Sequence, residues 1–209
     1  VMLACASAAG AAPQAPSASP SSAPAGAKPE GPGLFISPFG EPFRSSHGLA
    51  DWFAGADADH DGALTPKEFA ADGLRFLRVL DTDHDGRVDG FENTAYENDV
   101  APEILPQSAF FRPGRDEDPA AGGPALRARG LDGASTFGLL DEPQPVRGAD
   151  QNYDGKITAD EQAKAAARRF ALLDPEGTGR LALPPLQARL AQREAPPSGF
   201  ARFFRRRPD

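Results

Sequence analysis

The sequence predicts an all-α protein in which short acidic loops join successive helices, and three observations predict this class. Acidic segments of twelve residues lie at 57–68 and 81–92, and a third lies at 150–161. Between the first two, apolar residues recur at the spacing of one face of a helix. Thr65 and Thr158 each stand three residues before a glutamate, which is the pattern of a helix N-cap.

The first 33 residues are rich in Ala, Pro and Ser, which predicts a disordered tether. Met2-Leu3-Ala4-Cys5 resembles a bacterial lipobox, in which the cysteine receives lipid. Two interpretations stay open: the remnant of a secretion signal with an incidental cysteine, or a lipidated Cys5 that anchors the chain. Both predict a location in the periplasm or outside the cell.

Residues 34–43 hold three phenylalanines and one isoleucine between prolines, which predicts an extended segment. Core packing is its favoured role, because aromatic side chains dominate the energetics of buried clusters. The alternative is that it presents its aromatic side chains to a peptide or protein partner.

The helices follow from apolar spacing and from their start signals. Thr65, Pro66 and Glu68 form the start of a helix, and Gly73 lies in the middle of that helix, where it is expected to permit close packing. The prolines at 143 and 145 leave only a stunted helix, 146–149, before the third acidic segment. Residues 112–138 hold several Pro and Gly pairs and predict an irregular connection. The other expected helices are 49–56, 66–80, one after Glu92 to about residue 101, 159–173 and 184–193. The helix after Glu92 is expected to carry Phe91, Ala95 and Tyr96 as its apolar residues.

The three acidic segments, named loops 1, 2 and 3, carry oxygen ligands at positions 1, 3, 5, 7, 9 and 12. This spacing suits calcium, which takes about seven oxygens at roughly 2.3–2.6 Å, with a backbone carbonyl from position 7 and a bidentate glutamate at position 12. Glycine at position 6 permits the sharp turn. The expected ligands are Asp57, Asp59, Asp61, Ala63, Thr65 and Glu68 in loop 1; Asp81, Asp83, Asp85, Arg87, Asp89 and Glu92 in loop 2; and Asp150, Asn152, Asp154, Lys156, Thr158 and Glu161 in loop 3.

A fourth segment, loop 4 at 174–185, keeps the turn but has lost ligands. Ala182 stands at position 9, and Pro185 stands where the glutamate belongs. We therefore expect loop 4 to be an empty structural partner of a working loop.

The pairing of the loops follows from helix length. A helix over 66–80 is about 22 Å long, so it holds loops 1 and 2 at opposite ends. The same holds for loops 3 and 4 across 159–173. Pairing is then expected between the halves, loop 1 with loop 4 and loop 2 with loop 3. The alternative is a break of the helix at Gly73, which would let loops 1 and 2 pair with each other. The residues at position 8 that would form the bridges are Leu64, Val88, Ile157 and Leu181.

Charge is unevenly distributed along the chain. Residues 51–103 hold 14 acids and 4 bases, whereas residues 104–193 hold 12 of each. The acidic half makes nucleic acid a poor partner. Three calcium ions would change the net charge from −8 to −2. The tail, 194–209, mixes arginine with phenylalanine, so membrane contact is expected at most through this tail or a lipidated Cys5.

These loops resemble those of the EF-hand superfamily, and their tandem arrangement is similar to that of secreted bacterial EF-hand proteins. The resemblance covers about residues 48–193 and implies calcium binding at the three complete loops. It predicts a calcium-stabilised module or a modest sensor. The alternative is a scaffold that calcium rigidifies and that presents aromatic segments to an unknown protein or membrane partner. No enzyme is expected, because no paired nucleophile and base can be named.

Overall fold

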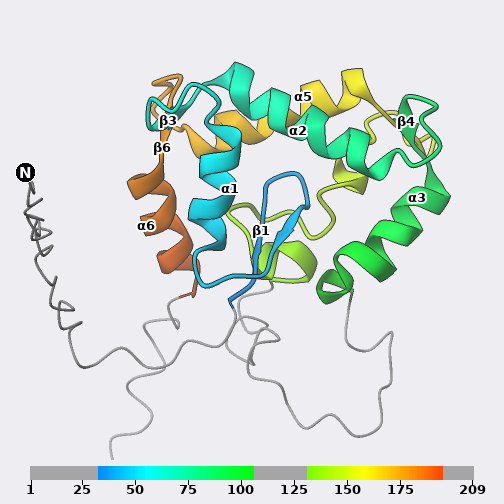
Figure 1. Ribbon diagram of the computed structural model, residues 1–209, viewed down its shortest axis with the longest axis horizontal. Helices are drawn as coiled ribbons and strands as arrows, with labels where there is room; N and C mark the ends of the chain where they lie inside the picture. The colour runs from blue at the N-terminus through cyan, green and yellow to red at the C-terminus, as the bar shows by residue number, and fades with distance from the viewer. Residues whose placement is uncertain (1–32, 106–130, 195–209) are drawn as a thin grey trace, which may run out of the picture. The chain divides into compact units, whose positions relative to one another are not determined.

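The computed structural model of the chain describes residues 33–105 and 131–194 (Figure 1). The predicted tether, most of the predicted connection 112–138 and the tail from residue 195 lie outside the described residues. The expected location and lipid attachment therefore stay predictions.

The elements follow the expected order, with helices joined by the four loops. The helices are α1 (Gly48–Ala56), α2 (Pro66–Leu80), α3 (Gly90–Ala95), α5 (Ala159–Leu173) and α6 (Leu183–Glu194). A π-helical turn, η1 (Tyr96–Val100), and the 3-10 turns η2 (Pro102–Ile104), η4 (Gly133–Thr136) and η5 (Arg147–Ala149) accompany them. The strands are β1 (Phe35–Ile36), β2 (Pro42–Phe43), β3 (Ala63–Leu64), β4 (Arg87–Val88), β5 (Ile157–Thr158) and β6 (Leu181–Ala182).

The predicted helix bounds agree closely with these elements. Both α2 and α5 begin and end where apolar spacing and the threonine caps place them. The stunted helix before loop 3 is the 3-10 turn η5. Within 33–105 and 131–194, none of the helices combines the length and apolar character that a membrane span requires.

The all-α prediction needs a qualification, because helices and short strands are mixed. Three two-stranded antiparallel sheets accompany the helices in the described residues: β1 with β2, β3 with β6, and β4 with β5. Each strand is two residues long, so the helices still supply most of the core.

Helices α2 and α5 lie side by side and pack against each other, along the top of the view in Figure 1. They run antiparallel, because β3 precedes α2 and pairs with β6, which follows α5. In the same way β4, after α2, pairs with β5, before α5. The Gln162 side-chain amide on α5 donates a hydrogen bond of 3.0 Å to the Gly73 carbonyl on α2. The two helices thus hold all four loops in two groups, one at each end of the pair.

The segment 34–43 forms a hairpin whose apolar side chains enter the core. Phe35, Ile36 and Phe39 are buried, and the Phe39 and Phe69 rings lie 4.8 Å apart between centroids. A Cβ at Gly73 would lie 2.6 Å from a Phe39 ring carbon, so the glycine lets this ring approach α2. The core-packing role is confirmed. The third phenylalanine, Phe43, is partly buried and packs against the same core. That this segment presents aromatic side chains to a partner stays a prediction.

The helical stretch after loop 2 differs from its predicted apolar pattern. Phe91 is 88% exposed, whereas Tyr96 is buried and donates a hydrogen bond of 2.8 Å to the Gly40 carbonyl. Asn93, not Phe91, lies on the buried face of α3.

Candidate metal centre

All four loops share one backbone course. Position 6 is a glycine in the left-handed region in every loop, and position 4 also has a positive φ. Glycine adopts this conformation at little cost, whereas other residues are strained in it. The residue pairs at positions 4 and 6 are His60 and Gly62, His84 and Gly86, Tyr153 and Gly155, and Gly177 and Gly179. Loop 4 therefore keeps the turn even though it lacks ligands.

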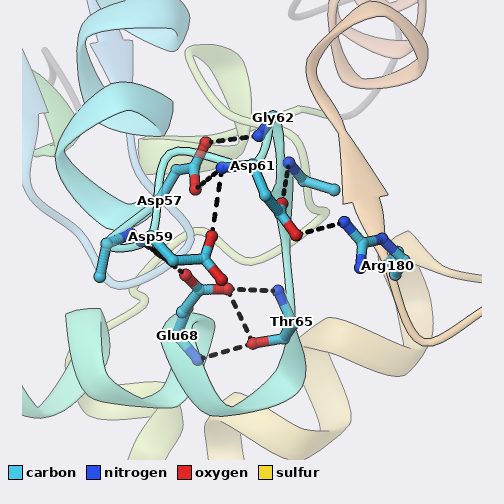
Figure 2. Close-up of polar contacts among 9 residues, drawn as sticks. Asp57, Asp59, Asp61, Gly62, Thr65, Glu68 and Arg180 are labelled. Atoms are coloured by element: carbon cyan, nitrogen blue, oxygen red, sulfur yellow. Dashed lines mark hydrogen bonds and ion pairs between the residues drawn. The ribbon is translucent and has the colours of Figure 1, made fainter.

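Three carboxylates converge in loop 1 (Figure 2). Asp57, Asp59 and Asp61 each place a carboxylate oxygen within 4.8 Å of the others. The buried Asp57 carboxylate accepts hydrogen bonds from the Asp61 N–H at 3.2 Å and the Gly62 N–H at 3.0 Å. Backbone donors thus fix the first carboxylate, and the other two lie on the exposed side.

The Glu68 carboxylate folds across loop 1 and closes it (Figure 2). Its Oε1 accepts from the Ala58 N–H at 3.1 Å and the Asp59 N–H at 3.3 Å. Its Oε2 accepts from the Thr65 N–H at 2.9 Å and the Thr65 hydroxyl at 2.8 Å. These bonds, chiefly the one from the Thr65 backbone, lower the pKa of Glu68. The carboxylate is therefore ionised at neutral pH, as a cation ligand must be.

Loop 2 repeats this arrangement. Asp81, Asp83 and Asp85 form a second carboxylate group with oxygens within 4.8 Å of one another. Glu92 closes the loop: its Oε1 accepts from the Thr82 N–H at 2.6 Å and its Oε2 from the Asp89 N–H at 3.0 Å.

Position 9 serves mainly as a helix cap. The Asp89 carboxylate accepts from the Phe91 N–H at 2.8 Å and the Glu92 N–H at 3.1 Å. Thr65 and Thr158 cap α2 and α5 in the same way. A side chain so engaged suits the indirect, water-mediated contribution that position 9 often makes to calcium.

Loop 3 is closed like the others but holds fewer charges. The Asn152 amide donates to Asp154 Oδ2 at 3.0 Å, so an amide takes the place of a carboxylate. Glu161 accepts from the Gln151 N–H at 3.3 Å and the Thr158 N–H at 3.0 Å. The Thr158 backbone bond is the main cause of a lowered pKa of Glu161. Glu161 thus closes loop 3, although within the described residues its acids do not form a group of three as they do in loops 1 and 2.

The predicted pairing between the halves of the chain is confirmed. Leu64 of β3 lies opposite Leu181 of β6, and Val88 of β4 lies opposite Ile157 of β5. Ala63 and Arg87, at position 7, belong to these strands, and Lys156 directly precedes β5. The bridges therefore fix the backbone at the position that would offer its carbonyl to an ion.

Residues 49–71 match the family model described as EF hand. The matched residues span most of α1, all of loop 1 and the start of α2. No curated protein and no solved structure matches the chain. The resemblance to secreted bacterial EF-hand proteins stays a prediction.

Loop 4 has the same backbone course as loops 1 to 3, but it satisfies its oxygens internally. The Asp174 carboxylate accepts from the Thr178 N–H at 2.9 Å and the Gly179 N–H at 2.7 Å. The Thr178 hydroxyl lies 2.9 Å from Asp174 Oδ1 and 3.0 Å from the Arg180 carbonyl oxygen. The Thr178 hydroxyl thus contacts both the position 1 carboxylate and the position 7 carbonyl oxygen. Neither Ala182 nor Pro185 adds a ligand.

A contact that the sequence analysis missed joins loop 4 to loop 1. The Arg180 guanidinium donates to Asp61 Oδ2 at 2.6 Å (Figure 2). This hydrogen bond is the main cause of a raised pKa of Arg180. The signal was available: once loops 1 and 4 are paired, a basic residue at position 7 of loop 4 faces an acidic loop.

Proposed function

We propose that the chain binds calcium through loops 1, 2 and 3, and that loop 4 supports loop 1 without binding an ion. One observation carries this proposal. In each of the three loops the glutamate at position 12 reaches back across the loop and accepts hydrogen bonds from the backbone N–H groups at positions 2 and 9. An EF-hand match and two clusters of three aspartates support the same ligand. Loop 4, with a proline at position 12, cannot close in this way.

The donor chemistry favours calcium over other metals. The side chains at positions 1, 3, 5 and 12 of the three loops offer only oxygen, which hard cations prefer and soft metals do not. Magnesium demands near-octahedral geometry at about 2.0–2.1 Å and gives up its water reluctantly. A loop that supplies three side chains, one carbonyl and a bidentate glutamate suits the larger ion.

The arrangement of the loops suggests that calcium stabilises the fold. Each end of the α2 and α5 pair carries two bridged loops, so an ion that orders one loop also supports its bridge to a loop distant in sequence. An ion that binds only the folded chain stabilises it by about 2.7 kcal/mol at a hundredfold excess over Kd. The alternative within the same proposal is that the chain acts as a modest calcium sensor.

Calorimetric titration with calcium tests the proposal directly. We expect a stoichiometry of three for the parent, and of two for each of Glu68→Gln, Glu92→Gln and Glu161→Gln. The matched control is Glu176→Gln, which removes the carboxylate at position 3 of loop 4 and should leave three sites. A parent that binds no calcium, two ions or four ions contradicts the proposal, as does a loss of a site in the control.

A further inference from the structure

The Arg180 side chain forms an ion pair with Asp61, one of the proposed calcium ligands of loop 1. Its Nη2 lies 2.6 Å from Asp61 Oδ2, with the two side chains 52% and 37% exposed. The other oxygen of Asp61 accepts from the Ala63 N–H at 3.0 Å. Both carboxylate oxygens of position 5 are therefore engaged, one of them by a positive charge from another loop (Figure 2).

Two features of loop 4 hold the Arg180 side chain beside loop 1: its strand bridge to loop 1 and its internal hydrogen bonds. Its bridge to β3 fixes it beside loop 1. Thr178 holds Asp174 and the Arg180 carbonyl, so the loop keeps its shape without an ion. Asp59 and Glu68 of loop 1 add further attraction for the guanidinium.

The contact distinguishes loop 1 from loop 2. Loop 2 is bridged to loop 3, whose position 7 is Lys156. Within the described residues, Lys156 forms no ion pair with a loop 2 acid. Arg87 of loop 2 lies 3.4 Å from Asp85 of the same loop, a longer contact than that between Arg180 and Asp61.

We propose that Arg180 sets the calcium affinity of loop 1, pairing with Asp61 when calcium is absent and opposing the ion when it binds. The inference rests on the proposed function of loop 1. Calcium and the guanidinium require the same carboxylate, and two cations held close together repel each other. A contact made only in the calcium-free state must lower the affinity by the free energy it contributes there. Loop 4 would thus regulate its partner with a cation of its own.

The test is a calcium titration followed by NMR at the glycine amides of position 6. Gly62, Gly86 and Gly155 each donate at 3.0 Å to the first aspartate of their loop, so each amide reports one site. We expect Arg180→Gln to lower the calcium midpoint at Gly62 by about threefold or more, the order expected of an exposed ion pair. The calcium midpoints at Gly86 and Gly155 should change by less than about half of the change at Gly62. The effect should shrink with added salt, which screens exposed charges.

The matched control is Arg44→Gln, which removes one positive charge from an exposed pair with Glu103. It should leave all three midpoints unchanged. An unchanged Gly62 midpoint in Arg180→Gln overturns the inference, and so does an equal shift at all three glycines, which would indicate a general charge effect. If the parent shows no calcium response at any glycine, the proposed function fails as well, which is a distinct result.

Melting temperatures separate this role from a merely structural one. If Arg180 opposes calcium, Arg180→Gln lowers the melting temperature in chelator but leaves it equal or higher in saturating calcium. A contact that only stabilises the fold would lower both values, and this result would overturn the inference.

Discussion

At the scale of single residues, two positions have the clearest effects: Gly73, which has no side chain, and Arg180, a positive charge beside an acidic loop. Gly73 was expected to permit close packing, and the Phe39 ring is what approaches it. The ligand positions of loops 1 to 3 could be predicted because each is fixed by its distance from the first aspartate. Arg180 could not be found in this way, because its role depends on which loop lies beside it.

Replacing Gly73 by Ala should destabilise the protein. The new Cβ would lie 2.6 Å from a Phe39 ring carbon, and such overpacking costs about 1–3 kcal/mol. This exceeds the gain of nearly 1 kcal/mol in helix propensity. We expect a net loss of up to about 2 kcal/mol in the free energy of unfolding, measured by urea denaturation.

Gly55→Ala is the matched control, because a Cβ at Gly55 in α1 meets no atom within 4 Å. It should stabilise the protein by about 0.5–1 kcal/mol. A stabilising Gly73→Ala would show that the hairpin does not need its close approach to α2.

At the scale of elements, helix length decided the architecture. Because α2 and α5 are each 15 residues long, neighbouring loops cannot meet, and the bridges join the two halves of the chain instead. The two-residue strands were foreseen only as bridges, so the all-α prediction understated them. The exposure of Phe91 was missed, because apolar spacing over so short a helix does not fix which face is inward.

Loop 2 should depend on calcium more than loop 3. It gathers five acids within twelve residues, whereas loop 3 has only three at its ligand positions. In calcium, Glu92→Gln should therefore lower the melting temperature more than Glu161→Gln does. Each loss should be on the order of 5–10 °C if one site contributes about 2.7 kcal/mol.

Thermal unfolding of both variants and the parent, in calcium and in chelator, checks this. In chelator the three proteins should melt at lower and more similar temperatures, since no ion then distinguishes them. A parent whose melting temperature is unmoved by chelation would refute calcium-dependent stability.

At the scale of the whole molecule, charge and core are coupled through the loops. The chain carries a net charge of −8, concentrated in its first half, and the paired loops bring much of it to the ends of α2 and α5. The apolar cluster runs from the hairpin through α1, α2 and α5 to Leu186 of α6, so ions at the loops act on one connected core. Composition predicted the charge, but only the pairing shows that loop 4 brings a cation to loop 1.

The most direct measurement for the central claim is a calcium titration of the parent that follows one glycine amide in each loop. The Gly179 N–H donates to Asp174 at 2.7 Å, so loop 4 has the same reporter as loops 1, 2 and 3. The account predicts saturable shifts at Gly62, Gly86 and Gly155, with no direct binding response at Gly179 beyond a small shift that follows Gly62. A separate saturation at Gly179, or no response at the other three glycines, would contradict it.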